Sequence, residues 1–283
     1  MSHTDQETPV ALVSGAGQGV GLGIARVLAK AGHRVALLDI EADRAIEAAD
    51  SLVREGCVAI GLRLDVASAR EWDQVVESVG QTWPRIDLLV NNAGISPRGT
   101  IESTDEALWD RTFAINLKGA WLGIKACLPK LRISRGAIVN IGSTRSTRPM
   151  PGLFAYVTSK AGLLGLTRQT AVECLVDGVR CNMVAPGWVD TPGERIIQAN
   201  HGRPDFPEGL MNLVTPEEVG ETVVFLTGNA GRRISGTCLY VDSGLHVADD
   251  AGMVYLPNVV KERYHSPVVP DQIDGSPIDR RSK

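Results

Sequence analysis

The chain has 283 residues, of which 43% are hydrophobic and 22% charged, and its net charge at pH 7 is −4. This composition is that of an ordinary globular protein and is sufficient for one large α/β domain. The acidic balance without a basic block argues against nucleic acid or a membrane surface as a partner, and no apolar run is long enough to span a membrane.

The cysteines and the N-terminus point to a cytoplasmic protein. The odd count of five and the lack of a C-x-x-C pair favour reduced thiols over a disulfide framework. They are Cys57, Cys127, Cys174, Cys181 and Cys238. The first nine residues are polar and lack the apolar core of a signal peptide.

A glycine-rich turn follows the first predicted strand, Val10–Val13. Residues 14–23 carry five glycines, and apolar residues then keep helical spacing up to Gly32. Strand, glycine turn and helix form the context of a phosphate-binding loop, because glycines admit a pyrophosphate and a helix N-terminus offers free N–H groups. The spacing Gly-x-x-x-Gly-x-Gly departs from the common dinucleotide fingerprint, and a plain turn is the alternative.

Acidic residues end the next two predicted strands. Arg34–Leu38 leads to Asp39, and Val58–Leu64 leads to Asp65. A carboxylate about 20 residues past the loop can accept both ribose hydroxyls and would repel a 2′-phosphate, so Asp39 predicts NAD rather than NADP. Asp65 is suited to accept from an adenine amino group or to cap the following helix, and the two roles are compatible.

Besides the helix after the glycine turn, three helices are predicted in the first half of the chain, at residues 41–54, 68–82 and 105–130. The predicted apolar face of the first consists of Ala45, Ile46, Ala49, Leu52 and Val53. Apolar residues surround much of the third, which indicates burial on more than one side. Asn116 interrupts its pattern and must hydrogen-bond if buried, either as a structural amide or as a water anchor beside a catalytic pair.

The fourth predicted strand, Ile86–Val90, is followed at once by Asn91-Asn92-Ala93-Gly94. Small and amide residues at the end of a strand suit the close approach of a ribose, and a turn stabilised by Asn is the alternative.

The stretch after the fifth predicted strand, Ala137–Ile141, holds the candidate catalytic residues. Tyr156 and Lys160 are four residues apart, so on a helix both side chains share one face. An ammonium close to a phenol lowers the pKa of the phenol, which makes Tyr156 a candidate general acid–base. Ser143 is placed to hold a substrate oxygen beside the phenol. Tyr-x-x-x-Lys alone is a weak motif.

The last third of the chain is predicted to add two strands, Val179–Val184 and Thr237–Val241, and a helix from Thr215 to Leu226. Residues 192–213 are predicted to be an irregular polar loop, of a length that is usually functional or mobile. After Gly244 the chain has many prolines and little periodicity, yet it keeps enough apolar residues to pack on something. We expect residues 246–283 to be an extension that covers the active site or a neighbouring subunit.

Taken together, these residues resemble the single-domain branch of the short-chain dehydrogenase/reductases, over roughly residues 8–245. The motifs that carry the resemblance are Ser14-Gly15…Gly19-Val20-Gly21, Asn91–Gly94, Asn116, Ser143, Tyr156, Lys160, Pro186-Gly187 and Thr191. Ser14 stands where Thr is more usual, and Asp242-Ser243-Gly244 where a second Gly is common. The region after residue 245 lies outside the resemblance.

The resemblance implies an α/β, doubly wound Rossmann-type fold with a parallel seven-stranded sheet in the order 3-2-1-4-5-6-7. The alternation of predicted strands and helices agrees with it. Residues 1–245 are then a single dinucleotide-binding and catalytic domain. The resemblance also implies a homotetramer, or a dimer, with the helices near residues 105–130 and 155–177 at one interface.

The implied activity is NAD-dependent hydride transfer between a secondary alcohol and a ketone, with Tyr156 as general acid–base, Ser143 on the substrate oxygen, Lys160 on the nicotinamide ribose and Asn116 holding a water. No metal is implied. The implied cofactor-binding residues are Gly15, Gln18, Gly19, Val20, Gly21, Asp39, Asp65, Val66, Asn91, Ala93, Gly94, Tyr156, Lys160, Pro186, Gly187, Val189 and Thr191.

The substrate is less well defined by the sequence. We expect a polar small molecule, either a polyol or sugar or an anionic hydroxy compound, because several arginines lie in segments that border the cleft in this fold. The candidate substrate residues are Arg98, Arg145, Arg148, Trp188 and Arg195, with His201 and Arg203 further along the same loop. The alternative interpretation is that each of these arginines is a solvated surface residue without a role in substrate binding. Other hypotheses are a reductase of cyclic or 3-oxoacyl-type ketones, an epimerase or dehydratase, for which the C-terminal region is too short, and a non-catalytic NAD sensor.

Overall fold

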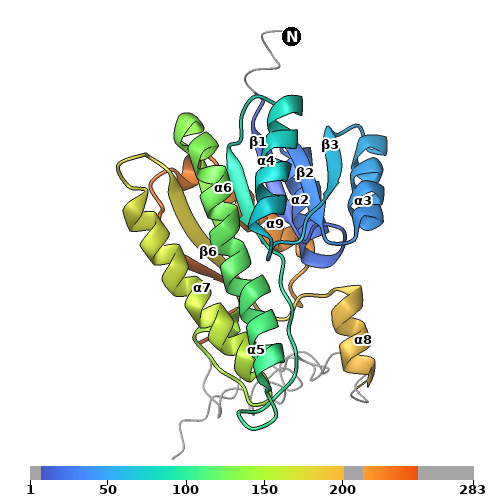
Figure 1. The fold of residues 1–283 in the computed structure, drawn as a ribbon, viewed down its shortest axis with the longest axis vertical. Coiled ribbons are helices and arrows are strands. Elements are labelled where there is room, and N and C mark those ends of the chain that lie inside the picture. The colour runs from blue at the N-terminus through green and yellow to red at the C-terminus, as the bar shows by residue number, and fades with distance from the viewer. Residues whose placement is uncertain (1–7, 201–212, 248–283) are drawn as a thin grey trace, which may run out of the picture.

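The computed structural model describes residues 8–200 and 213–247, with the backbone alone at 197–200. Seven parallel strands form one sheet in the order β3-β2-β1-β4-β5-β6-β7, which confirms the predicted topology (Figure 1). The strands are β1 (Val10–Ser14), β2 (Arg34–Asp39), β3 (Ala59–Arg63), β4 (Leu88–Asn91), β5 (Ala137–Ile141), β6 (Arg180–Pro186) and β7 (Cys238–Val241).

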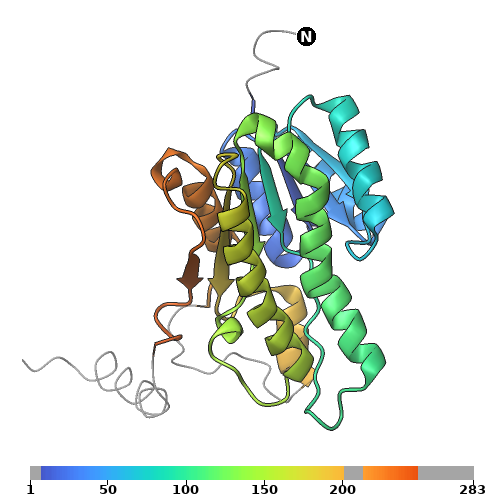
Figure 2. The same ribbon diagram turned by 60° about the vertical axis from the view of Figure 1, so that its left-hand side comes forward.

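Helices cover both faces of this sheet (Figures 1 and 2). One face carries α2 (Gly19–Lys30), α3 (Ala42–Arg54) and α9 (Pro216–Thr227). The other carries α4 (Ala69–Thr82), α6 (Gly119–Ser134) and α7 (Phe154–Glu173). The remaining helical segments are α5 (Glu106–Phe113), η1 (Ala114–Lys118), η2 (Thr144–Ser146), α8 (Pro192–Asn200) and η3 (Asn229–Gly231). None of the helices in the described ranges has the length and apolar character needed to cross a membrane.

Side chains of the central strand β1 show why two helical layers are needed. Ala11 and Val13 point into the core shared with α2 and α9, whereas Val10 and Leu12 point into the core shared with α4 and α6. All four are fully buried. Successive side chains of a strand point to opposite faces, so a strand that is apolar on both faces requires cover on both sides.

The strand order places a crevice at the carboxyl end of β1. The chain passes from β1 to β2 on one side and reaches β4 on the other, so the crossovers diverge at this point. In open parallel sheets ligands bind in the crevice outside the carboxyl ends of the strands, where the order reverses. The glycine turn after β1 and the two asparagines at the end of β4, Asn91 and Asn92, both lie there.

Two of the predicted helical segments are corrected by the structure. The single helix expected at residues 105–130 is divided into α5 and α6 by a π-helical turn, Ala114–Lys118, that contains Asn116. The face predicted for α3 is partly wrong, because Ile46 is 47% and Val53 50% exposed. The buried residues of α3 are three alanines and Leu52. The helix lies close to β3, since a Cβ on Gly61 would lie 2.3 Å from the carbonyl oxygen of Ala45.

The expected irregular loop at 192–213 is also partly wrong, because it begins with the helix α8. Thr191 caps this helix, with Oγ1 accepting a hydrogen bond from Glu194 N at 3.2 Å, and Pro192 begins it. A capping residue followed by Pro is a helix-start signal. His201 and Arg203, expected near the substrate, lie outside the described residues, as do residues 248–283 of the C-terminal extension.

Candidate active site

The glycine turn after β1 has a conformation and close internal contacts that only glycine permits at several positions. Gly15 and Gly19 have φ values of 62° and 57°, in the left-handed region that side chains disfavour. At Gly21 a Cβ atom would lie 2.1 Å from the carbonyl oxygen of Gly15. Gly21, in the first turn of α2, therefore tolerates no side chain, and the glycine turn leads directly into the N-terminus of α2 with its free N–H groups.

The residues after β4 hold this turn in place. Asn92 Nδ2 donates to the carbonyl oxygens of Ser14 (2.9 Å) and Gly15 (3.0 Å), while Ser14 Oγ accepts from the backbone N–H groups of Asn92 and Ala93. Asn92 is a site residue that the sequence-based assignment passed over. Asn91, which was assigned, has its side chain buried between β5 and α6, where Nδ2 donates to Asn140 Oδ1 at 2.9 Å.

The two acidic residues lie at the strand ends as predicted. Asp39 Oδ2 accepts from Gly17 N at 3.0 Å, so this carboxylate sits directly beside the glycine turn. Asp65 Oδ1 accepts from Ala67 N at 2.9 Å. The alternative reading of Asp65 as a helix cap is wrong, because Ser68 caps α4. Val66, also assigned to the cofactor, is buried against Gly119 of α6.

The three central catalytic candidates come together. A hydrogen bond joins the side chains of Ser143, directly after β5, and Tyr156, on the first turn of α7. Lys160 lies one helical turn further, with Nζ 5.9 Å from the centroid of the Tyr156 ring. Its ammonium donates to the carbonyl oxygen of Ile141 at 2.8 Å and is buried.

The electrostatics of this group differ from the prediction. Burial raises the pKa of Tyr156, while the hydrogen bond to Ser143 and the charge of Arg145 lower it in part. The predicted lowering of the tyrosine pKa by Lys160 is therefore wrong in this structure, since Lys160 turns its ammonium toward a backbone carbonyl. Burial lowers the pKa of Lys160 itself to about 8.

Asn116 joins three segments around the catalytic helix. Its Oδ1 accepts from Ile95 N at 2.9 Å, and its Nδ2 donates to Ile95 O at 2.9 Å and to Ser159 Oγ at 3.0 Å. Both donors of the amide are thus used. The π turn places Asn116 beside Gly94 and Lys160. The distances show this: a Cβ on Gly94 would lie 3.3 Å from Asn116 Oδ1 and 3.5 Å from Lys160 Nζ.

Two adjoining cavities meet at Tyr156. The smaller has a volume of about 200 Å³ and extends to Lys160. The larger has a volume of about 480 Å³. Residues that line both are Val20, Ser96, Ser143, Tyr156, Gly187 and Val189. The smaller cavity is also lined by Asn92, Gly94, Ile95, Ile141, Gly142, Lys160 and Pro186. A reacting carbon at their junction would lie beside the phenol.

The larger cavity collects most of the predicted substrate residues. Arg98, Arg145, Arg148 and Trp188 line it, as does Thr191. Burial lowers the pKa of Arg145, and the charges of Arg148 and Arg98 lower it further, as expected for a cluster of cations.

Arg195 is not brought into the larger cavity: its guanidinium is exposed and pairs with Asp190, with Nε 2.6 Å from Oδ1. Glu194, Leu245 and His246 are among the lining residues that sequence reasoning missed. The sequence Thr-Pro-x-Glu that ends at Glu194 is typical of a helix N-terminus, so the beginning of α8 could have been predicted. Residues 245 and 246 carried no signal, because their position depends on how the chain turns after β7.

Comparison with known proteins agrees with this geometry. Residues 15–246 match the family model described as enoyl-(acyl carrier protein) reductase. The chain is 35% identical over 246 residues to 2-(S)-hydroxypropyl-CoM dehydrogenase 3 of Xanthobacter autotrophicus, an alignment that covers 83% of this chain and 96% of that protein. It is 33% identical over 241 residues to trans-4-hydroxycyclohexanecarboxylate dehydrogenase of Sinomonas cyclohexanicum, covering 83% and 92% of the two chains.

Among solved structures, the chain resembles 3-ketoacyl-(acyl-carrier-protein) reductase from Brucella melitensis, determined in complex with NADH. The TM-score is 0.77 at 27% identity, and the superposition covers 84% of this chain and 98% of the other. Fold, site geometry and family model thus point the same way. The chain belongs to the short-chain dehydrogenase/reductase family and is an oxidoreductase that acts on alcohols.

Proposed function

We propose that this protein is an NAD-dependent dehydrogenase of secondary alcohols in which Tyr156 is the general acid–base. The observation that carries the proposal is the position of Tyr156 at the junction of two cavities, hydrogen-bonded to Ser143 and one helical turn from Lys160. A non-catalytic NAD sensor would need neither the phenol nor the larger cavity beside it.

The residues present fit a dinucleotide. The turn from Gly15 to Gly21, with Gln18, Gly19 and Val20, offers backbone N–H groups to a pyrophosphate. Asp39 is placed for the adenosine ribose hydroxyls and favours NAD over its 2′-phosphorylated form. Asp65 and Val66 would border the adenine. The smaller cavity would take the nicotinamide and its ribose, beside Gly94, Lys160, Pro186, Gly187 and Val189. The proposed cofactor residues Asn91, Ala93 and Thr191 are not part of its lining, and Thr191 lines the larger cavity. NAD, when bound, supplies the hydride acceptor.

The chain's own residues handle the proton and the substrate oxygen. Ser143 holds the oxygen by a hydrogen bond and keeps the phenol of Tyr156 beside it. Tyr156, when ionised, takes the proton of the alcohol, and when neutral it donates a proton to a ketone oxygen. Lys160 would bind the ribose. Asn116, on its π turn, would hold a water that links Lys160 to solvent.

The substrate is proposed to be polar, either anionic or rich in hydroxyl groups. The support is electrostatic: three arginines line the larger cavity, and Glu194 is the acidic side chain within its described lining. A guanidinium binds a carboxylate or sulfonate through two parallel hydrogen bonds. The 2-(S)-hydroxypropyl-CoM and hydroxycyclohexanecarboxylate named for the two relatives are both anionic secondary alcohols.

A matched pair of alcohols and one variant test the proposal. NADH formation is followed by absorbance with cyclohexanol and with trans-4-hydroxycyclohexanecarboxylate, which differ by the carboxylate. We expect higher kcat/KM for the carboxylate. Tyr156→Phe should lower kcat by about 10²-fold or more, the scale of general acid–base catalysis. Thr158→Ala, an exposed change on the same helix, serves as control. Near wild-type turnover by Tyr156→Phe would remove Tyr156 from the mechanism.

A second candidate is a reductase of cyclic or 3-oxoacyl-type ketones. It is compatible with the raised pKa of Tyr156, because the neutral phenol can donate a proton to a ketone oxygen. It also matches the name of the ketoacyl reductase of similar structure. NADH consumption with a 3-oxoacyl thioester, measured beside the alcohol panel, separates the two. A kcat/KM for the thioester well above that of every alcohol would favour the reductase.

We also propose a cytoplasmic homotetramer, or a dimer, built on a single catalytic domain at residues 1–245. Five free thiols, three of them buried, support a reducing compartment. Exposed apolar side chains on α6 and near the end of α7, including Trp121 and Val172, support a covered face on these helices. Sedimentation tests the oligomeric state, and thiol titration tests whether the five cysteines are reduced.

A further inference from the structure

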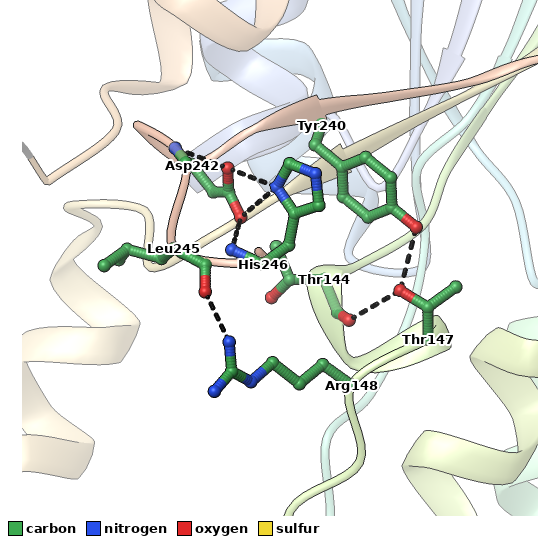
Figure 3. A network of polar contacts seen from close by, with 8 residues as sticks. Thr144, Thr147, Arg148, Tyr240, Asp242, Leu245 and His246 are labelled. Atoms are coloured by element: carbon green, nitrogen blue, oxygen red, sulfur yellow. Dashed lines mark hydrogen bonds and ion pairs between the residues drawn. The ribbon is translucent and has the colours of Figure 1, made fainter. Parts of the chain in front are cut away.

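The turn after β7 is held together by one buried carboxylate. Asp242 is 3% exposed and accepts from Gly244 N (3.0 Å), His246 N (2.7 Å) and His246 Nδ1 (3.0 Å) (Figure 3). Because a carboxylate only accepts, Nδ1 carries the proton. The imidazole of His246 also stacks on the Tyr240 ring, with centroids 3.8 Å apart. Ser243, where the family usually has a second Gly, adopts a left-handed φ of 55°.

This turn is tied to the loop that carries the catalytic serine. The Tyr240 hydroxyl and Thr147 Oγ1 form a hydrogen bond at 2.8 Å, and Arg148 Nη1 donates to Leu245 O at 2.8 Å (Figure 3). Thr147 and Arg148 follow η2, which begins one residue after Ser143. Two segments about 100 residues apart in sequence therefore brace each other.

The same turn borders the site of reaction. Leu245 and His246 line the larger cavity together with Ser143 and Tyr156. On its other side His246 lines a second cavity, of about 610 Å³, between β7 and α9. The turn thus lies between two hollows. Because residues 242–247 are held both by Asp242 and by the contacts with Thr147 and Arg148, they define the shape of the larger cavity on this side.

We propose that residues 242–247 form a fixed wall of the substrate cavity, in which Asp242 is the positioning residue and Leu245 sets the size of alcohol that reaches Tyr156. The specificity part rests on the proposed function, because it requires that the larger cavity hold the alcohol. Leu245 supplies the apolar contact, and Asp242 fixes where that contact stands. The hydrogen bonds of Tyr240 with Thr147 and of Arg148 with Leu245 fix the loop after Ser143 against the same wall.

Kinetics with cyclopentanol and cyclohexanol test the role of Leu245, since the two substrates differ by one methylene. A methylene in an apolar pocket changes kcat/KM by about tenfold or more. We expect Leu245→Ala to raise the ratio of kcat/KM for cyclohexanol over cyclopentanol about tenfold, mainly through KM. Leu175→Ala, at an exposed leucine beyond the far end of α7, is the matched control and should leave the ratio unchanged. A change below twofold in Leu245→Ala would overturn the size role.

Amide hydrogen exchange tests the role of Asp242 without any substrate. Asp242→Ala removes the acceptor of two backbone N–H groups, so exchange should speed up at residues 243–247. Through the brace it should also speed up at residues 144–148, while exchange in β1 stays unchanged. Asp242→Asn keeps one acceptor oxygen and should restore much of the protection. Tyr240→Phe keeps the ring stack and loses the hydroxyl, so it should affect residues 144–148 more than residues 243–247.

The alcohol kinetics and the amide hydrogen exchange test separate parts of the proposal, so each part can be contradicted without the other. If Asp242→Ala changes exchange only at 243–247, the brace to the Ser143 loop is wrong. If it changes neither segment, Asp242 is not a positioning residue. If the wild-type enzyme oxidises no secondary alcohol, the proposed function and the size role of Leu245 both fall, and the exchange data alone decide whether the wall is fixed by Asp242.

Discussion

At the scale of single residues, the protonation of Tyr156 determines the direction of proton transfer. Burial raises the pKa of its phenol, and the hydrogen bond to Ser143 and the charge of Arg145 offset this in part, whereas the charge of Glu194 raises it further. The neutral phenol, present below its pKa, donates a proton to a ketone. The phenolate, present above it, accepts a proton from an alcohol. Alcohol oxidation should therefore increase toward alkaline pH.

Two substitutions that should shift the pKa of Tyr156 in opposite directions test this assignment of its electrostatic environment. Arg145→Gln removes a charge that lowers the pKa of Tyr156, so the rise in kcat/KM for alcohol oxidation should move to higher pH. Glu194→Gln removes a charge that raises this pKa, so the rise should move to lower pH. Arg98→Gln changes the charge of the same cavity without being among the groups that act on Tyr156, and its profile should stay in place. Coincident profiles for the first two variants would contradict the assignment.

At the scale of elements, one side chain of β6 closes the end of α9. Arg180 is half-buried and donates to the carbonyl oxygens of Leu226, Thr227, Gly231 and Ile234. The last carbonyls of a helix lack partners within the helix, and a cation there also interacts favourably with the helix dipole. Arg180 thus joins the sheet to the segment that leads into β7 and, beyond it, to the cavity wall.

Loss of this contact should weaken the whole fold. Arg180→Ala is expected to lower the free energy of unfolding by about 2 to 3 kcal/mol, since hydrogen bonds to a charged group contribute about 1.5–3 kcal/mol and buried carbonyls would remain unpaired. Chemical denaturation monitored by circular dichroism measures it. Arg232→Ala removes an exposed guanidinium that bonds only Asn229 among the contacts seen for it, and should change stability by less than about 0.5 kcal/mol. Equal effects of both variants would refute the role of Arg180.

Elements were predictable from sequence wherever a local rule governs them. Most strands are short apolar runs ended by a polar or glycine residue, and all seven predicted strands are present. Their order, which the family resemblance implied, is confirmed as well. The π turn at Asn116 was not predictable, because the partners that turn its amide inward, Ile95 and Ser159, come from distant segments. The exposure of Ile46 and Val53 likewise depends on what packs against α3, which periodicity alone does not contain.

At the scale of the whole molecule, the larger cavity gathers residues from five separate parts of the chain, near Val20, Arg98, Arg145, Trp188 and Leu245. The first four could be predicted because each follows a strand, and the carboxyl ends of parallel strands meet at one edge of the sheet. Leu245 could not, since the chain after β7 is also held by contacts with a distant segment, Tyr240 with Thr147 and Leu245 with Arg148.

The role proposed for residues 246–283, as a cover over the active site or a neighbouring subunit, belongs to this scale. A chain shortened after Val247 keeps the wall and lacks the rest. If the extension covers a site, the shortened protein should show a raised KM for the alcohol or a smaller assembly, each by at least a fewfold. Kinetics and sedimentation of the two proteins decide it. An unchanged KM together with an unchanged assembly would reject the covering role.

The assembly proposed on α6 and α7 can be tested by placing a charge on its face. Trp121 of α6 is 46% exposed, and a large aromatic side chain left open to water is commonly buried by a partner. Trp121→Glu should bury a carboxylate in that interface and so convert a species of four times the 30.3 kDa chain mass into a smaller one. Ile46→Glu, at a residue 47% exposed on α3, introduces the same charge away from α6 and α7 and should leave the mass unchanged. Multi-angle light scattering reads out both variants, and a tetramer that survives Trp121→Glu would place the interface elsewhere on the molecule.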